Sequence, residues 1–225
     1  MKTGNDIKKN CAQAALQYIP NHSVIGLGGG STITYLIDFI KEKNLQIKIV
    51  TPSAQTRMLC LQKGLEVLHT SSVEQVAVAF DGCDQVDHHL RALKSGGGIH
   101  TKEKLIGHMA DDYILLVDKS KVVDTLTFQH PVVLEVLEDS LAYVTKAVRA
   151  LGGKTTIRTS NAKDGFIISD NGHLLIDAQF ENVTDIEKLE NNLKNISGVI
   201  DTSLFINVVT KVLIASDEGI TILSK

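Results

Sequence analysis

The chain of 225 residues contains no tryptophan, only three prolines and only three cysteines. No apolar run approaches the roughly 20 residues of a membrane-spanning helix, and the first ten residues lack the apolar segment of a secretory signal. The net charge of -3 gives no overall positive field for nucleic acid or for an anionic membrane surface. These absences argue against membrane, collagen-like, disulfide-rich and disordered proteins. A phosphate-bearing partner would have to be held by a local site.

The three cysteines point to a reducing compartment. Cys11, Cys60 and Cys83 are odd in number, lie far apart and form no Cys-x-x-Cys pair, which favours the cytoplasm over a disulfide framework. The neighbouring His88 and His89 match no metal-binding spacing, and a solvated loop explains them better. We therefore expect no disulfide and no metal ion.

Strands and helices alternate through the first half of the chain. Strand-like apolar runs occupy residues 23–27, 47–51, 65–68, 76–80 and 113–117. Helical patterns lie before and between them, among others at residues 6–18, 53–63 and 101–110. The runs at 76–80 and 113–117 are nearly continuous, as in strands that are buried on both faces of a parallel sheet. The sequence thus predicts an α/β fold with a Rossmann-like, doubly wound, mostly parallel sheet.

The pattern changes after Pro131. Strands are predicted at residues 132–136, 166–169, 174–177 and from 198, with helices at 140–150 and 185–195. Asp170-Asn171-Gly172 is a strong hairpin signal between two of these strands. The order βαββαβ describes a small ferredoxin-like α+β sheet, after which residues 204–223 are again strand-like. We expect one domain of residues 1–130 plus 204–225 and a second, smaller one of residues 131–203.

A glycine-rich segment, residues 26–32, joins the first predicted strand to a helix. Backbone amides at a helix amino terminus favour an anion, and Ser31 and Thr32 add hydroxyl donors. The spacing fits neither the Rossmann glycine fingerprint nor a Walker loop. A tight turn with a helix cap explains the same residues about as well as phosphate binding does.

Polar groups follow other buried strands at the same sheet edge. Asp81 and Asp84 come after one strand, and two carboxylates at this spacing can hold different protonation states. Lys94 precedes three glycines, where a cation and exposed amides can stabilise an oxyanion. Glu103 lies in the first turn of a helix, where capping alone would usually explain it. Lys121 follows another strand, where it could face an anionic ligand or simply be a solvated loop lysine. Asp87 is better explained as a turn residue than as a catalytic group.

These motifs together resemble the type A ribose-5-phosphate isomerase family over essentially the whole chain. The family-like stretches keep the family's order and spacing. They are residues 26–32, 81–84, 94–98, 101–104, 118–121, 131–136, 151–153, 170–172, 198–199 and 204–205.

The resemblance implies an aldose–ketose isomerase that interconverts D-ribose 5-phosphate and D-ribulose 5-phosphate without a metal or organic cofactor. The enzyme would act in the non-oxidative branch of the pentose phosphate pathway, as a cytoplasmic homo-oligomer, either a dimer or a tetramer. Its partner would be the small phosphosugar substrate, not nucleic acid or a membrane.

The resemblance also implies a role for each site residue. Glu103 is the base that moves a proton between C2 and C1 through an enediolate, and Asp81, supported by Asp84, assists opening of the furanose ring. Lys94 and the amides of three following residues hold the developing oxyanion. The three amides are those of Ser95, Gly96 and Gly97, which are also implied to bind the substrate. The other residues implied in substrate binding are Lys8, Gly29, Gly30, Ser31, Thr32, Gly82, Cys83 and Lys121.

The chain departs from the family's pattern at a few positions. Gly29 stands where members usually carry Thr, so one hydroxyl donor to phosphate is missing. Cys83 and Gln85 replace Ala and Glu, Ser95 replaces a glycine, and the usual Arg-Gly-Ala-Asp segment after Phe205 is absent. These changes bear on affinity, rate and sugar preference, because they leave every residue assigned to proton transfer in place.

Two other functions compete with the isomerase. A related fold senses sugar phosphates without turnover in some transcriptional regulators, but here no helix-turn-helix segment precedes the α/β region, and Glu103 and Lys94 are retained. A dinucleotide-dependent oxidoreductase is disfavoured because the glycine fingerprint fails and Thr51 stands where an acidic residue would end the second strand.

Overall fold

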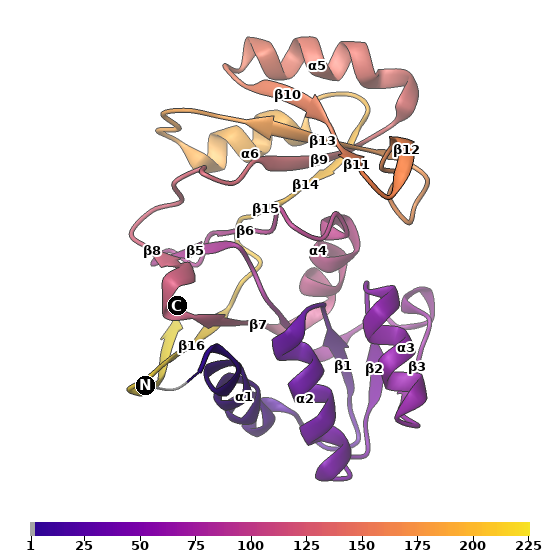
Figure 1. Cartoon of the computed structure of the whole chain (residues 1–225), viewed down its shortest axis with the longest axis vertical. Helices are drawn as coiled ribbons and strands as arrows, with labels where there is room; N and C mark the ends of the chain where they lie inside the picture. The colour runs from indigo at the N-terminus through magenta and orange to yellow at the C-terminus, as the bar shows by residue number, and fades with distance from the viewer. Residues whose placement is uncertain (1–2) are drawn as a thin grey trace.

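The computed structural model describes residues 3–225 and contains two main sheets, one above the other in Figure 1. The larger, lower sheet has seven strands in the order β17-β16-β7-β4-β1-β2-β3. All its neighbouring strands are parallel except the edge pair β16 and β17. The strands are β1 (Val24–Leu27), β2 (Lys48–Val50), β3 (Glu66–Val67), β4 (Val76–Asp81), β7 (Ala110–Asp118), β16 (Lys211–Ser216) and β17 (Gly219–Ser224). The predicted Rossmann-like fold class is confirmed.

Helices cover both faces of the large sheet. They are α1 (Gly4–Ala15), α2 (Ser31–Glu42), α3 (Ala54–Gln62) and α4 (His100–Met109). Strand side chains alternate between two cores: Ile25 and Leu27 of β1 pack with α1 and α2, while Ala79 of β4 packs with Ile106 of α4. Among residues 3–225, no helix combines the length and apolar character needed to cross a membrane.

The close approach of α4 to the sheet depends on Gly26 in the middle of β1. A Cβ atom at this position would lie 2.6 Å from both the Ala79 Cβ and the Ile106 Cγ2 atoms. A side chain there would force the helix outward, because protein cores have little spare volume. Gly26 therefore lets α4 pack directly on the centre of the sheet, next to the edge at which β1 and β4 end.

The smaller, upper sheet has the antiparallel order β10-β13-β9-β14. Its strands are β9 (Val132–Val136), β10 (Lys154–Ile157), β13 (Leu174–Gln179) and β14 (Val199–Thr202). The helices α5 (Leu141–Ala150) and α6 (Ile186–Lys194) share one core with Val132, Leu134 and Val136 of β9. This is the predicted ferredoxin-like arrangement, with both helices packed against one side of the sheet.

One strand of the small sheet differs from its prediction. The Asp170-Asn171-Gly172 turn is present, with the Gly172 amide donating to the Ser169 carbonyl at 2.9 Å. However, residues 166–169 contribute only one isolated bridge to this sheet, between Ile168 and Leu174, while Phe166 pairs with Thr159 in a separate hairpin. The neighbour of β13 is instead β10. Its sequence, Lys-Thr-Thr-Ile, has a single apolar residue, which is why the apolar pattern missed it.

Short strands connect the two main sheets. A third sheet has the order β15-β6-β5-β8 and lies between the others in Figure 1. Its members are β5 (Gln85–Asp87), β6 (Ala92–Leu93), β8 (Val122–Val123) and β15 (Leu204–Phe205), and a separate hairpin joins β11 (Thr159–Ser160) to β12 (Lys163–Phe166). The prediction that the last strands return to the large sheet is confirmed for β16 and β17, whereas β15 pairs with β6.

Candidate active site

The candidate site lies where β1 and β4 end side by side in the large sheet. The chain leaves β1 through the glycine-rich turn into α2, and leaves β4 through Asp81 and Gly82. Open α/β sheets bind ligands at this edge, where neighbouring loops diverge. A Cβ atom on Gly28 would collide with the Asp81 carboxylate, so this glycine makes room for a buried acid.

Three ionisable side chains meet in the interior of this edge. The Lys94 Nζ atom lies 3.0 Å from Asp81 Oδ2 and 3.4 Å from Glu103 Oε1. All three residues are buried, with exposed fractions of 3% for Asp81, 7% for Lys94 and 8% for Glu103. They come from separate elements: the end of β4, the segment after β6 and the first turn of α4. The structure thus brings together the predicted acids and the predicted lysine.

Burial changes the acid–base character of this cluster. Removal from water raises the pKa of the Glu103 carboxyl, and the nearby Asp81 charge raises it further against the opposing effect of Lys94. Burial alone would lower the pKa of Lys94, but Asp81 and Glu103 outweigh it and raise that pKa. Lys94 is therefore held as a cation, and Glu103 is a stronger base than an exposed carboxylate.

Glu103 does not serve as a helix cap. The N-cap residue of α4 is Ile99, and no side-chain hydrogen bond caps this end. The Glu103 side chain is instead directed to Lys94, at 3.4 Å. The capping explanation of this glutamate is therefore wrong.

The loop after Lys94 differs from its predicted role. The Ser95 and Gly96 amides donate to Asp84 Oδ2 at 2.6 and 3.1 Å, so a carboxylate already occupies these two donors. The expectation that both amides hold an oxyanion is corrected here, because Asp84 uses them to fix the loop. Among the described residues, the Gly97 amide donates to no protein acceptor. Gly97 and the Lys94 ammonium are left as the donors for a developing negative charge.

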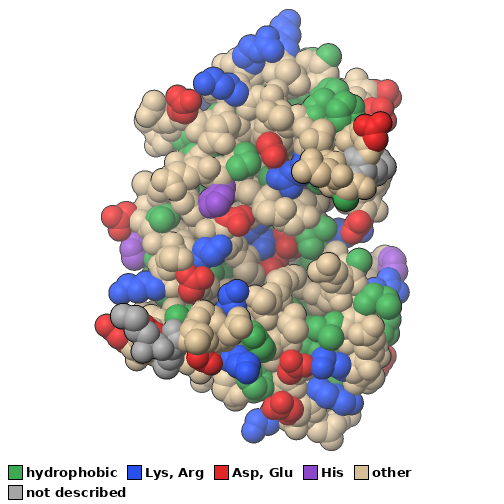
Figure 2. Space-filling view, viewed as in Figure 1, with side chains coloured by type: hydrophobic (Ala, Val, Ile, Leu, Met, Phe, Trp, Pro, Cys, Tyr) green, Lys and Arg blue, Asp and Glu red, His purple; other side chains and the backbone are tan. Residues whose placement is uncertain are grey.

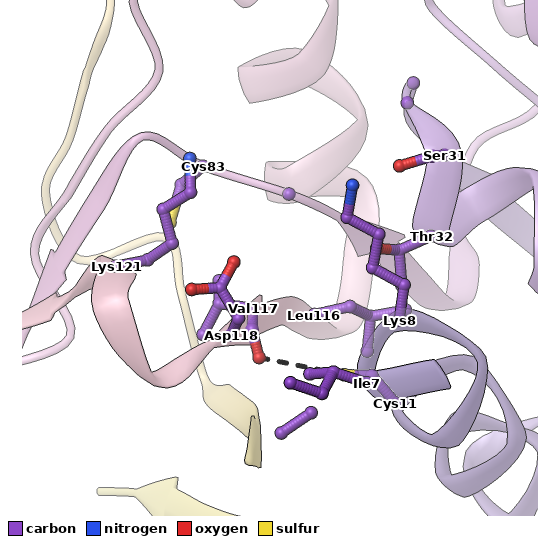
Figure 3. A pocket seen from close by; sticks show the side chains of 14 residues that line it. Ile7, Lys8, Cys11, Ser31, Thr32, Cys83, Leu116, Val117, Asp118 and Lys121 are labelled. Atoms are coloured by element: carbon purple, nitrogen blue, oxygen red, sulfur yellow. Dashed lines mark hydrogen bonds between the residues drawn. The ribbon is translucent and has the colours of Figure 1, made fainter. Parts of the chain in front are cut away.

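A cavity of about 250 Å³ lies beside the glycine-rich turn (Figure 3). Lys8 of α1, Ser31 and Thr32 at the start of α2, and Lys121 line it. Lys8 and Lys121 extend from opposite sides of this cavity in Figure 3. The N-cap residue of α2 is Gly30, with a φ of 94°, and no side-chain hydrogen bond caps the helix. The serine and threonine are thus not used as caps, and two cations beside a helix amino terminus make this cavity chemically suited to an anion.

This cavity continues into a second one of about 530 Å³. Gly29, Gly30, Gly82 and Cys83 line both, whereas Asp81, Asp84, Lys94, Gly96, Gly97 and Glu103 line only the second. The two spaces form one cleft with an anion site at one end and the acid–base cluster at the other. Figure 2 shows acidic and basic side chains together in the hollow between the two parts of the molecule.

Sequence reasoning missed several residues that line the cleft or support its walls. Tyr113 of β7 donates from its hydroxyl to Asp81 Oδ2 at 3.0 Å. Because Tyr113 belongs to an apolar strand, the sequence pattern indicates only a core residue. Ser53 and Gln55 line the second cavity, and their place just after β2, at the same sheet edge, was an available signal. Asp170 reaches this cavity from the small sheet, which no local pattern could have indicated.

The remaining predicted residues lie outside the cleft. Asp87 is fully buried and accepts the His89 and Arg91 amides at 3.0 Å each, which agrees with its interpretation as a turn residue. His88 lies 3.6 Å from Asp124 on the surface. Neither residue contributes to the acid–base cluster.

Comparison with known proteins gives a consistent result. The family model of ribose 5-phosphate isomerase A (phosphoriboisomerase A) matches residues 48–219. The ribose-5-phosphate isomerase A of Prochlorococcus marinus (strain NATL1A) is 37% identical over 225 residues, covering 97% of this chain and 95% of the relative. That of Methanocaldococcus jannaschii is 35% identical and covers 99% of this chain and 100% of the relative.

Solved structures agree in fold over the full length. The ribose 5-phosphate isomerase A structure from Methanocaldococcus jannaschii has a TM-score of 0.92 at 34% identity, covering 99% of this chain and 100% of that one. A D-ribose-5-phosphate isomerase in complex with phospho-erythronic acid has a TM-score of 0.94 at 32% identity, with both chains covered completely. The chain therefore belongs to the ribose 5-phosphate isomerase A family.

Proposed function

We infer that this protein is an aldose–ketose isomerase that interconverts D-ribose 5-phosphate and D-ribulose 5-phosphate. The observation that carries this inference is the buried Glu103, 3.4 Å from a lysine that remains charged, in a cleft whose far end is built for an anion. Moving a proton between adjacent carbons requires a carboxylate base and a site for the enediolate oxygen, and this cleft supplies both. The activity would place the enzyme in the non-oxidative branch of the pentose phosphate pathway.

In the proposed reaction Glu103 removes the proton from C2 of the open-chain aldose. The electron pair of the C2–H bond forms the C1–C2 double bond of the enediolate, and negative charge develops on the carbonyl oxygen O1. Lys94 and the Gly97 amide stabilise that charge. Glu103 then returns the proton to C1, and transfer of the O2 hydroxyl proton to O1 completes the ketose. All of these steps are proton transfers with no net change in oxidation state of the sugar, so the proposal includes no metal or organic cofactor.

Asp81 is proposed to assist ring opening before the isomerisation. Ring opening removes the proton from the O1 hydroxyl and delivers one to the ring oxygen. The Asp81 carboxylate lies at the cleft wall, where Lys94 and the Tyr113 hydroxyl both contact it at 3.0 Å. Asp84 supports this step indirectly, since it holds the loop that follows Lys94.

The phosphate of the substrate is proposed to bind at the opposite end of the cleft. The residues proposed to bind the substrate there and along the shared wall are Lys8, Gly29, Gly30, Ser31, Thr32, Gly82, Cys83 and Lys121. Helix-end amides, two hydroxyls and two ammonium groups together complement a dianion. The sugar would then extend from this end toward Glu103.

A phosphosugar sensor without turnover is the second candidate function. It would use the same anion site, and the small volume of that cavity fits it equally well. A sensor gains nothing from burying Glu103 and Lys94 together, because buried charges are costly to maintain unless they serve a purpose. The cluster therefore favours the enzyme.

We expect Glu103→Gln to lower kcat by about 10²–10⁴-fold, because a positioned base typically contributes that much. KM and melting temperature should change little, since glutamine keeps the size and hydrogen-bonding reach of glutamate and Lys94 keeps its ion pair with Asp81. In the wild type kcat/KM should rise with pH through an apparent pKa of about 8, because burial raises the pKa of the Glu103 carboxyl to that value and the base must be ionised. Glu187→Gln makes the same change in the first turn of α6 and serves as the control. Near-normal turnover of Glu103→Gln would contradict the proposed base.

We expect Thr32→Val to raise KM for ribose 5-phosphate by about tenfold to a hundredfold, because a hydrogen bond to a charged group contributes about 1.5–3 kcal/mol. The effect on kcat should be small, since Thr32 lies at the end of the cleft away from Glu103. Thr34→Val is the matched control on the same helix, since Thr34 is exposed. An unchanged KM in the Thr32 variant, measured by steady-state kinetics, would contradict phosphate binding by Thr32 at this end of the cleft.

The chain is proposed to divide into a catalytic domain of residues 1–130 plus 204–225 and a small domain of residues 131–203. A core centred on β9, β13, α5 and α6 supports this division, and Leu93, Leu126, Phe128 and Leu204 join it from the other part of the chain. Limited proteolysis should then yield a fragment close to residues 131–203 that still unfolds cooperatively. A fragment that has lost its secondary structure, as judged by circular dichroism, would contradict this.

The enzyme is proposed to be a cytoplasmic homo-oligomer, either a dimer or a tetramer. The cytoplasm is supported by Cys11, Cys60 and Cys83, all free thiols in the structure. The oligomer is supported by the family to which the chain belongs. Light scattering should give a mass of two or four times 24.4 kDa. A particle of 24.4 kDa at all accessible concentrations would rule the oligomer out.

A further inference from the structure

Arg158 of the small sheet reaches the loop that carries the proposed oxyanion donors. It lies between β10 and β11, and its side chain is only 16% exposed. Its Nη2 atom donates to the Ser95 carbonyl at 2.8 Å, and its Nη1 atom donates to the Gly96 carbonyl at 3.3 Å. Asp177 of β13 fixes the guanidinium from the other side, accepting from Nε at 3.0 Å and from Nη2 at 2.5 Å. The arginine thus joins two carbonyl groups of the loop to a carboxylate of the small sheet.

The carbonyl contacts determine the direction of the next amides. In a trans peptide group the C=O and N–H bonds point to opposite sides. The group between Ser95 and Gly96 demonstrates this, because its carbonyl accepts from Arg158 while its amide donates to Asp84 at 3.1 Å. The Gly96 carbonyl belongs to the same peptide group as the Gly97 amide. Since this carbonyl also faces Arg158, the Gly97 amide is directed away from the small sheet, to the side on which Gly97 lines the cleft with Glu103.

Glycine makes such external control necessary. Gly96 and Gly97 lack a Cβ atom, so rotation of the peptide group between them meets little steric resistance. Asp84 holds the preceding peptide group through its amide. Among the described residues, Arg158 supplies the only hydrogen bond to the Gly96–Gly97 group. A charged donor also polarises the group it contacts and strengthens its N–H as a donor.

We propose that Arg158 is a positioning residue for the isomerase reaction, which turns the Gly97 amide toward the enediolate oxygen and polarises it. This inference rests on the proposed function. It makes the small sheet part of the catalytic machinery, although Arg158 itself does not touch the reacting atoms.

The experiment compares Arg158→Gln and Arg158→Lys with the wild type. The matched control is Lys154→Gln, which removes a cation from the same region of the small sheet, where Lys154 forms an exposed ion pair with Glu181. For each protein we would measure kcat and KM for ribose 5-phosphate, the melting temperature, and the inhibition constant of phospho-erythronic acid. The planar carboxylate of this acid resembles an enediolate.

In Arg158→Gln we expect kcat to fall by about tenfold to a hundredfold, somewhat less than the usual effect of deleting an oxyanion donor. KM should stay within about threefold, and the inhibition constant should weaken roughly as much as kcat/KM falls, because both report binding of the enediolate-like state. Arg158→Lys keeps the positive charge beside Asp177 but lacks the planar guanidinium that donates to two carbonyl groups at once. Its kcat and inhibition constant should therefore lie between those of the wild type and of Arg158→Gln. Lys154→Gln should match the wild type.

The inhibition constant separates positioning from folding. A smaller folded fraction lowers the apparent kcat but leaves the inhibition constant unchanged, so that pattern would overturn the proposal. Wild-type values of both constants in Arg158→Gln would overturn it as well. If that variant does not fold, the same two constants in Arg158→Lys decide the question. A wild type that binds phospho-erythronic acid but does not isomerise ribose 5-phosphate would refute the proposed function and this inference with it.

Discussion

The buried ion pairs of Lys94 with Asp81 and Glu103 are the interaction on which the rest of the site depends. Removing charges from water costs several kcal/mol for each ion, so a lysine buried this deeply requires opposite charges around it. Lys94 has two carboxylates within 3.4 Å and also donates to the Gly82 carbonyl. The same enclosure raises the pKa of Glu103 while Lys94 keeps its charge. One packing arrangement therefore raises the pKa of the proposed base and keeps the proposed electrophilic partner charged.

Bringing these groups together requires the small sheet as well as the large one. The face of β9 opposite its helices carries Glu135, which accepts hydrogen bonds from Thr101 of α4 and from Ser169, Asn171 and His173. Burial would raise the pKa of Glu135, but these donors outweigh it and lower that pKa to about 2. Thr101 lies two residues before Glu103, and α4 lies beneath the small sheet in Figure 1. The small sheet thus holds both the helix that carries Glu103 and, through Arg158, the loop that follows Lys94.

The positions at which the chain departs from the family's usual residues can be located in this framework. Gln85 is buried and bonds to Thr127, with its Nε2 atom 2.7 Å from the Thr127 hydroxyl, so it is not among the residues that line the cleft. The Ser95 hydroxyl donates to the Pro131 carbonyl at 2.6 Å and so fixes the loop after Lys94 to the start of β9. A Cβ atom on Gly29 would lie 3.7 Å from the Ser53 hydroxyl oxygen. The Ser53 hydroxyl is therefore close to the place where other family members carry a threonine side chain.

The sequence alone determined the alternation of strands and helices in the large sheet, the alternation of buried faces, and the sheet edge at which Asp81, Lys94 and Glu103 would meet. These features follow from local periodicity and from the rule that parallel strands end at a common edge. Tertiary structure alone decided which amides stay free: Asp84 occupies those of Ser95 and Gly96, which leaves Gly97. It also decided that β10 and not residues 166–169 pairs with β13, and that Arg158 and Asp170 reach the site. Such contacts join residues from about 11 to more than 60 positions apart. Several of them depend on how the two main sheets pack on each other, which no local pattern encodes.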